Sequence, residues 1–235
     1  MSTSHPSGRV HPFATHLIQA LGVLILRPWM RLCFRAKVRH AAVDHETADH
    51  ATAWPVHPCV LACNHRSFAD PPFVAMWSSQ PVAFFARSSL WKIPGIKQML
   101  DLFYGIPVER ENPGISSMKG AIDRLRRGVS VLVFPEGTRT KTGRLGKLRD
   151  GPALFARRAG VPLVPVYVHR SEAIWPRGAL APRLCGARVE IRFGRPLVAP
   201  AGLEPREADA WVTRRLQAWM VAQERELQFQ HRQPR

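Results

Sequence analysis

The stretch over residues 59–72 joins a short apolar run to a histidine and an aspartate, two side chains that can exchange protons. His65 and Asp70 follow the apolar run at a point where a strand would end and a helix would begin. A histidine that takes a proton from a substrate hydroxyl needs a partner that fixes its tautomer and stabilises the imidazolium, and a carboxylate does both. The sequence therefore predicts His65 as a general base and Asp70 as the residue that orients it.

This pair can form only if the chain turns between the two residues. In a continuous helix His65 and Asp70 would point about 140° away from each other. Pro71 and Pro72 favour a helix that begins after the turn, because a helix tolerates proline in its first turn. Asp70 would then also suit the N-cap of that helix, where it would have a structural role alone. The residues leave both roles open.

Two other kinds of site are disfavoured in this stretch. The residues that could bind a metal are His57, Cys59, Cys63 and His65. On an extended strand the first and last of these lie ~26 Å apart, at about 3.3 Å per residue, which exceeds one coordination sphere. Ser67 is not expected to be a nucleophile, because its neighbours do not match the G-x-S-x-G pattern. We therefore expect no metal and no serine nucleophile.

A second polar group follows another apolar run, in VSVLVFPEGTRTK at residues 129–141. Pro135 and Gly137 suit the second and fourth positions of a tight turn, which would present Glu136 and Arg139 just beyond a strand. Ligands of open parallel sheets bind beyond the carboxyl ends of the strands, so this loop and the histidine loop are expected to converge. Arg139 is a candidate for binding an anionic group, because a guanidinium pairs with phosphate through a planar fork.

Short apolar runs alternate with helical patterns, which predicts an α/β fold with a largely parallel sheet flanked by helices. The predicted strands cover residues 59–63, 82–86, 129–134, 163–168 and 189–193. The predicted helices cover residues 71–78, 115–127, 152–159 and 206–229. The last strand alternates polar and apolar residues, as a half-exposed edge strand would. Pro162 and Pro165 place their strand at an edge, or else lie at its beginning.

The N-terminal segment is expected to associate with a membrane. Residues 13–30 are the most apolar part of the chain, but their uninterrupted core covers only residues 20–26. A spanning helix needs about 20 apolar residues, so an interfacial helix fits better. The basic residues that follow at a regular spacing are Arg27, Arg31, Arg35 and Arg39. On a helix they would form one cationic stripe for phospholipid headgroups, and a solvated helix face is the alternative.

The chain divides into this membrane-associating helical segment at residues 1–40, a connector at 41–58 and a catalytic domain at 59–235 that ends in a helix. The 34 Lys and Arg against 17 Asp and Glu give a net charge of +17. Such a charge indicates an anionic partner: nucleic acid, an anionic membrane or an acidic protein. The cysteines, at positions 33, 59, 63 and 185, are expected to be small buried apolar side chains in a reducing compartment.

Four short motifs, in this order and spacing, resemble the blocks of the glycerolipid acyltransferases, specifically the 1-acylglycerol-3-phosphate acyltransferases. The motifs are NHRSFAD at residues 64–70, IPVER at 106–110, FPEGTRT at 134–140 and VPLVPV at 161–166. Tyr104 and Glu109 stand where the family often has Gly and Asp. These two departures leave Arg110 in place and concern the shape of its loop.

The resemblance implies that His65 deprotonates the free hydroxyl of lysophosphatidic acid, which attacks an acyl thioester directly to give phosphatidic acid. By the same resemblance, the acceptor's phosphate and glycerol are held by Arg110, Glu136, Gly137 and Arg139. The implied donor is acyl-CoA or acyl carrier protein, and no metal or bound cofactor is required. The implied location is the cytoplasmic face of a membrane, with an anionic membrane surface as a partner and no nucleic acid.

Two alternatives remain open at the level of the sequence. An acyltransferase for another lyso-lipid acceptor, such as a lyso-aminolipid, would use the same chemistry. A basic nucleic-acid-binding module would explain the charge without catalysis, although the chain has no recognisable nucleic-acid-binding motif.

Overall fold

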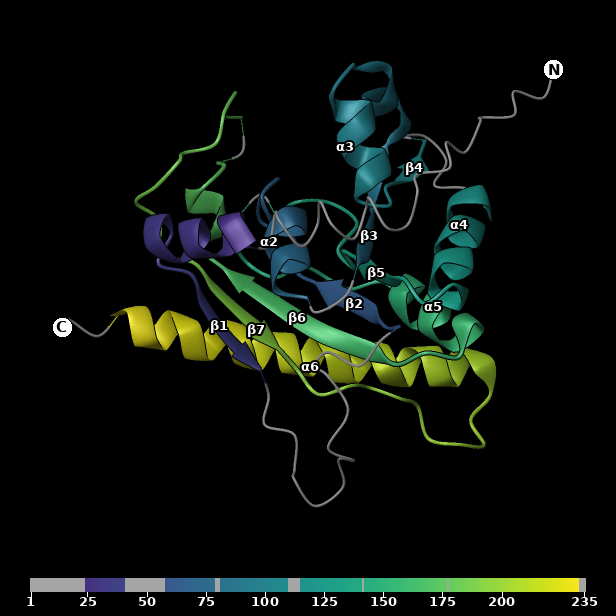
Figure 1. Cartoon of the computed structure of the whole chain (residues 1–235). Coiled ribbons are helices and arrows are strands. Elements are labelled where there is room, and N and C mark those ends of the chain that lie inside the picture. The colour runs from purple at the N-terminus through teal and green to yellow at the C-terminus, as the bar shows by residue number, and fades with distance from the viewer. Residues whose placement is uncertain are drawn as a thin grey trace.

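The computed structural model describes residues 24–40, 58–78, 81–109, 115–140, 142–176 and 178–232. Within them a seven-stranded sheet has the order β1-β7-β6-β2-β5-β3-β4 (Figure 1). The strands are β1 (Lys37–His40), β2 (Val60–Cys63), β3 (Val82–Arg87), β4 (Ile106–Val108), β5 (Ser130–Val133), β6 (Leu163–His169) and β7 (Glu190–Phe193). Neighbouring strands pair in parallel except β6 and β7. The predicted α/β fold with a largely parallel sheet is confirmed.

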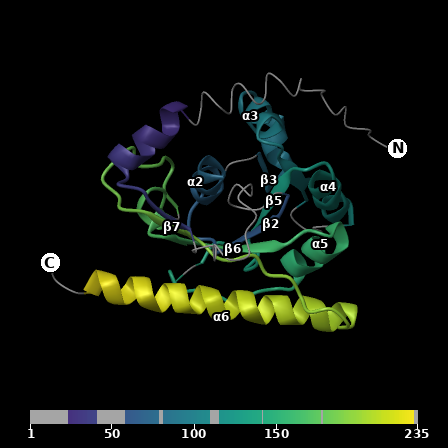
Figure 2. The ribbon, with the colours of Figure 1, turned by 60° about the horizontal axis from the view of Figure 1, so that its bottom comes forward.

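Helices cover both faces of the sheet. They are α2 (Asp70–Trp77), α3 (Ile96–Leu102), α4 (Ile115–Arg126), α5 (Gly151–Ala159), α6 (Pro205–Arg232) and a helical segment over residues 24–33. Short 3-10 turns lie at Ser88–Lys92 and Ser171–Ala173. The long helix α6 runs along one face, and α2 lies on the opposite face (Figure 2). Gly128 and Gly160 take positive φ at the ends of α4 and α5, as expected for helix C-termini.

The residues of β2 show how the sheet separates two cores. Leu61 and Cys63 pack in the cluster that contains α2, whereas Val60 and Ala62 pack in the cluster that contains α4, α5 and α6. All four side chains are fully buried. A continuous apolar run is expected for a central parallel strand, because helices cover both of its faces. The end of β2 is therefore held firmly from both sides.

The prediction that residues 189–193 form a half-exposed edge strand is wrong. β7 lies between β1 and β6, and all four of its residues are buried. Its polar residues pair with each other and with α6: Arg192 contacts Glu190 at 2.7 Å and Glu226 at 2.8 Å. Because α6 covers this face, the polar half of the alternation faces helix carboxylates and not solvent.

The edge position suggested for the proline-containing strand is also wrong, and the other alternative holds. β6 lies between β7 and β2, with Pro162 just before it and Pro165 near its beginning. The Pro165 carbonyl accepts a hydrogen bond from Gly194 N at 2.8 Å, beyond the last residue of β7. A backbone N–H at residue 165 would point to the same side as this carbonyl. Because the paired residues of β7 end before Gly194, the N–H that proline lacks removes no hydrogen bond between β6 and β7.

The single cationic helix stripe is wrong beyond residue 33. The helix ends there, Arg35 takes a positive φ of 42°, and Arg39 lies in the edge strand β1. Lys37 N donates to Val189 O at 2.9 Å, which joins this part of the chain to the sheet beside β7. Residues 1–23 and 41–57, which carry the rest of the predicted anchor and connector, lie outside the described residues.

The arginines that remain on the helix bind α2. Arg27 Nη2 donates to Ser78 O at 3.1 Å, and the guanidinium groups of Arg27 and Arg31 lie 5.5 Å and 5.0 Å from the centre of the Trp77 ring. α2 has no basic residue in its own last turn. Arg27 therefore supplies the positive charge that favours a helix C-terminus.

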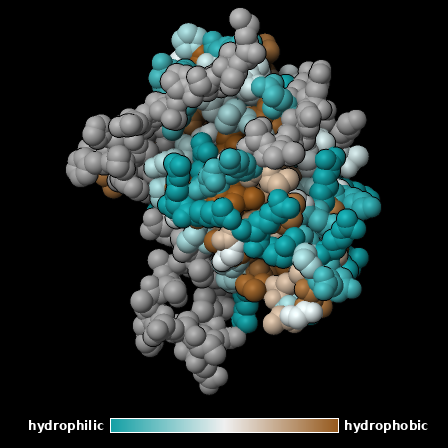
Figure 3. Space-filling model, turned by 90° about the vertical axis from the view of Figure 1, so that its right-hand side faces the viewer, coloured by the Kyte–Doolittle hydropathy of each residue, from teal (hydrophilic) through white to brown (hydrophobic). Residues whose placement is uncertain are grey.

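The described surface is largely polar on one side, and two of the cysteines are buried. Figure 3 shows the face on the α4 and α5 side, where hydrophilic side chains cover much of the described surface. Among the described residues, no helix is long and apolar enough to cross a bilayer. The four cysteines are free; Cys59 and Cys63 are buried as expected, whereas Cys33 is half-buried and Cys185 is exposed, which corrects the prediction for these two.

Candidate active site

The candidate active site begins where β2 ends. His65 Nδ1 lies 2.9 Å from Asp70 Oδ2, so the chain makes the turn that the pair requires. The Asp70 side chain is fully buried and the His65 side chain is 17% exposed. An ionised carboxylate only accepts hydrogen bonds, so Nδ1 carries the proton and Nε2 carries the lone pair of the neutral ring. This is the tautomer that a general base needs.

Asp70 does not cap the helix that it begins. The N-cap of α2 is Ala69, which makes no side-chain cap hydrogen bond. Asp70 Oδ2 instead accepts the backbone N–H groups of Arg66 and Ser67, at 2.7 Å and 2.8 Å, together with the His65 ring. One carboxylate oxygen thus accepts hydrogen bonds from three residues that precede Asp70, and these bonds fold the loop back onto itself. The purely structural N-cap role is therefore wrong.

The Ser67 hydroxyl supports the histidine loop. This hydroxyl donates to Trp175 O at 3.1 Å and accepts the backbone N–H of Ala69 at 3.1 Å. Both bonds tie the loop to its surroundings. The hydroxyl is thus occupied in supporting the turn, as the sequence indicated.

The two predicted loops converge. Glu136 Oε1 accepts His65 N at 2.9 Å, and Thr140 N donates to His65 O at 2.9 Å. Glu136 Oε2 accepts Gly146 N at 2.9 Å, so both carboxylate oxygens bind backbone groups. The imidazole stacks on Phe134, with ring centres 3.9 Å apart and planes 16° apart. Glu136 and Phe134 therefore hold the histidine from the second loop.

The second loop contains the expected turn. Gly137 N donates to Phe134 O at 3.0 Å, and Gly137 takes a φ of +72°. A Cβ at this position would lie 3.3 Å from the guanidinium carbon of Arg149. Arg149 in turn donates its backbone N–H to Pro135 O at 3.0 Å. Glycine is thus favoured both by the backbone conformation and by the close approach of Arg149.

Arg139 extends from the second loop to the histidine loop. Its guanidinium carbon stands 3.6 Å from the centre of the Phe68 ring, which is 53% exposed. Phe68 also meets Trp175 edge to face, with ring centres 5.5 Å apart. Stacking uses the flat face of a guanidinium, so its N–H groups point along the ring plane. Of the predicted site residues, His65, Asp70, Glu136, Gly137 and Arg139 come together, and Arg110 lies outside the described residues.

Comparison with known proteins assigns the family. A family model described as Acyltransferase matches residues 43–169. The chain belongs to the acyltransferase family.

Relatives with named activities agree with this assignment. A chloroplastic 1-acyl-sn-glycerol-3-phosphate acyltransferase of Brassica napus is 33% identical over 52% of this chain and 36% of the relative. A 1-acyl-sn-glycerol-3-phosphate acyltransferase of Pseudomonas aeruginosa is 30% identical over 71% of this chain and 63% of the relative. The chain therefore spans about a third of the plant relative and under two thirds of the bacterial one.

A solved structure shares the fold. The 1-acyl-sn-glycerophosphate acyltransferase of Thermotoga maritima superimposes with a TM-score of 0.69, covering 94% of this chain and 83% of that chain. Its sequence identity to this acyltransferase is 22%. The similarity supports the layered α/β architecture described above.

A buried polar network behind the histidine was not expected from the sequence. Arg66 is buried, and its Nη2 donates to the Tyr167 hydroxyl at 2.9 Å and to Glu224 Oε1 at 3.2 Å, while Nη1 reaches Glu172 Oε1 at 3.4 Å. Glu224 Oε1 also accepts Leu145 N at 3.1 Å. The histidine loop of this acyltransferase is therefore tied to α6, far along the chain.

The network keeps its charges fixed. Burial lowers the pKa of Arg66, but Tyr167, Glu172 and Glu224 outweigh it and raise that pKa above its ordinary value. Burial raises the pKa of Tyr167 to about 12, despite the opposing effect of Arg66. Arg66 thus stays cationic and Tyr167 stays neutral over the working pH range. The sequence signal was only the position of Arg66 inside the histidine motif.

We expect Asp70→Asn to preserve the fold and to abolish most activity. The amide oxygen can still accept the two backbone N–H groups, but the amide cannot stabilise an imidazolium and favours the wrong tautomer of His65. The acyl-transfer rate constant should fall by about 10⁴-fold, as for the equivalent change in a serine protease. Thermal unfolding and kcat check this together. A variant with normal stability and a normal rate would leave Asp70 as a loop-folding residue alone.

We expect Glu224→Ala to destabilise the acyltransferase by about 2–4 kcal/mol, because it removes a partner of the buried Arg66 charge and of Leu145 N. Glu207→Ala is the control on the same helix, since Glu207 is exposed. The control should cost less than about 1 kcal/mol. Urea unfolding measures both variants. Equal losses would contradict a special role for the Arg66 network.

Proposed function

We propose that this acyltransferase transfers an acyl chain from a thioester donor to the free hydroxyl of lysophosphatidic acid and forms phosphatidic acid. The observation that carries the proposal is the His65–Asp70 pair at 2.9 Å, next to a loop that presents Arg139. A general base beside a cationic group suits an acceptor that has both a hydroxyl and a phosphate. The names of the two relatives support the same acceptor.

The reaction is a direct transfer. His65 Nε2 takes the proton of the acceptor hydroxyl as its oxygen attacks the thioester carbonyl, and Asp70 stabilises the imidazolium. The tetrahedral intermediate collapses, the C–S bond breaks, and the thiol leaves as thiolate, which takes the proton. A thiol with a pKa near 8.5 needs little help to leave, so a second acid is unnecessary. The donor is acyl-CoA or acyl carrier protein.

The acceptor is held by the second loop. Arg139 binds the phosphate with the edge of its guanidinium while its face rests on Phe68. Gly137 lets the turn pass close to Arg149, and Glu136 supports both loops through its backbone hydrogen bonds. From the second motif, we assign Arg110 to the same role of binding the acceptor's phosphate and glycerol.

The enzyme works at the cytoplasmic face of a membrane, where a lyso-lipid acceptor resides. The helix over residues 24–33 exposes Leu24, Ile25 and Leu32, which supports contact with a lipid surface. The net charge of +17 favours an anionic membrane. The N-terminal segment supplies this association as an interfacial element.

The function is tested by purified-enzyme acylation of lysophosphatidate beside a panel of other lyso-lipids, including a lyso-aminolipid. Lysophosphatidate should be the best acceptor by kcat/KM. His65→Ala should lower kcat by at least about 10³-fold, because removal of a general base and its charge-stabilised state leaves only positioning.

His40→Ala is the matched control, since His40 lies in the edge strand β1 and is exposed. It should retain nearly full activity. A faster reaction with another lyso-lipid would assign that acceptor instead. Undiminished transfer by a folded His65→Ala variant would remove His65 as the base.

A further inference from the structure

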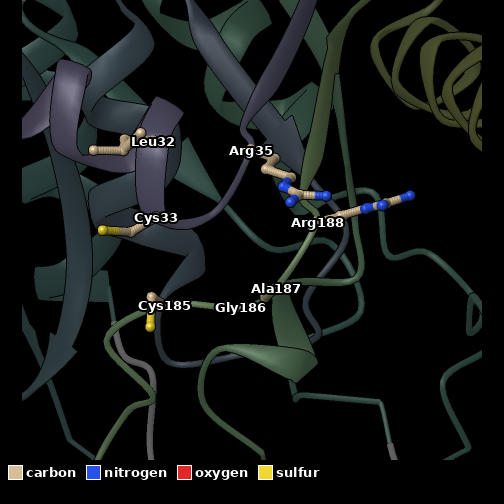
Figure 4. A pocket seen from close by; sticks show the side chains of 7 residues that line it. All are labelled: Leu32, Cys33, Arg35, Cys185, Gly186, Ala187 and Arg188. Carbon is tan, nitrogen blue, oxygen red and sulfur yellow. The ribbon is translucent and has the colours of Figure 1, made fainter.

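A pocket separate from the candidate active site lies between the end of the helix over residues 24–33 and the segment over residues 185–188. Its volume is about 460 Å³ (Figure 4). Backbone hydrogen bonds join its two sides: Gly186 N donates to Cys33 O at 2.9 Å, and Val189 N donates to Phe34 O at 3.2 Å. The walls are thus fixed to each other by the main chain. Neither His65 nor Arg139 lines it.

Arg35 and Arg188 line this pocket from opposite segments, and Figure 4 shows their guanidinium groups extending toward the same side. Among the described residues, no carboxylate forms an ion pair with either arginine, whereas the nearby Arg39 and Arg192 both pair with Glu190. Two cations that line one pocket and have no acidic partner in the described part of the chain repel each other, so an anion between them would stabilise the pocket.

Arg35 lies two residues past the last residue of the helix. It takes a φ of 42°, the left-handed conformation with which many helices end. This turn ends the helix and brings Arg35 to the pocket that it lines.

Exposed leucines border the pocket on both sides. Leu32, which lines it, is 81% exposed, and Leu184, next to the lining residue Cys185, is 69% exposed. Leu24 and Ile25 are also exposed on the same helix, and Leu180 is exposed in the chain before Leu184. Apolar side chains around a cationic pocket match the layers of a lipid leaflet, where phosphates lie just above acyl chains. A free anion in water would gain nothing from the leucines.

We infer that this pocket binds the phosphate of an anionic phospholipid in the membrane and serves as a docking site distinct from the acceptor site. The helix inserts Leu32 and the loop inserts Leu184, while Arg35 and Arg188 hold the headgroup between them. Arg27 and Arg31 take no part, because they contact Trp77 and α2. Trp175 O accepts the Ser67 hydroxyl, so the histidine loop contacts the chain near this surface.

The test is co-sedimentation with vesicles of the full chain that carries both Arg35→Gln and Arg188→Gln, called the pocket variant. The matched control is Arg214→Gln/Arg225→Gln, which removes the same charge from exposed positions on α6. On vesicles of phosphatidylcholine with phosphatidylglycerol, the pocket variant should bind at least about 10-fold more weakly, and the control should stay within about twofold of the unmodified protein. Equal losses would mean general charge attraction and would overturn the pocket.

A second measurement guards against misfolding of the pocket variant. In a Cys33→Ser background Cys185 is the exposed thiol, since Cys59 and Cys63 are buried. Phosphatidylglycerol vesicles should slow its reaction with a water-soluble thiol reagent severalfold, and phosphatidylcholine vesicles should not. An unchanged reaction rate would place this surface away from the membrane and contradict the inference.

Two further experiments distinguish a lipid phosphate from free phosphate in the pocket, and the pocket from the acceptor site. Inorganic phosphate at millimolar concentration should not release the protein from the vesicles; full release would make the pocket a site for soluble anions. The KM for a soluble short-chain lysophosphatidate should be unchanged in the pocket variant. A KM raised about 10-fold would assign the pocket to the acceptor and overturn the docking role, whereas inactivity of the unmodified protein would fail the proposed function alone.

Discussion

The structure of the site depends on one buried carboxylate oxygen. Asp70 Oδ2 accepts the His65 ring and the backbone N–H groups of Arg66 and Ser67. These donors lie just before Asp70 in sequence, so satisfying them folds the loop into a turn at the end of β2. The same hydrogen bonds fix the imidazole tautomer. Folding of the loop and preparation of the base are therefore one event, since an unpaired buried carboxylate would be costly.

The rest of the molecule holds this turn from three sides. Glu136 binds the backbone N–H of His65 from the second loop, and Phe134 supports the imidazole by stacking. Arg66 binds Glu224 on α6, which places the C-terminal helix behind the histidine loop. A residue placed by a sheet, a second loop and a distant helix keeps a narrow range of orientations, as acid–base chemistry requires.

The strands and helices with clear patterns were predictable from sequence, because buried parallel strands are continuous apolar runs and the helix ends are marked by Gly128 and Gly160. The short strands were not: β1 is polar, and β4 contains Pro107 in three residues. The face of β7 was misassigned because its charged residues pair with α6. The positions of His65, Asp70 and the FPEGTR loop, each just after a strand, were predictable from the order of residues along the chain. The Arg66 network was not, since Glu224 lies on a helix whose register only the tertiary packing sets.

The central claim is that one imidazole and one cationic loop act on the same acceptor. A crystal structure of the acyltransferase with bound lysophosphatidate tests this directly. The account predicts the free hydroxyl within about 3.2 Å of His65 Nε2 while the phosphate contacts Arg139. A phosphate bound on another face of the molecule, or a hydroxyl turned away from His65, would contradict it.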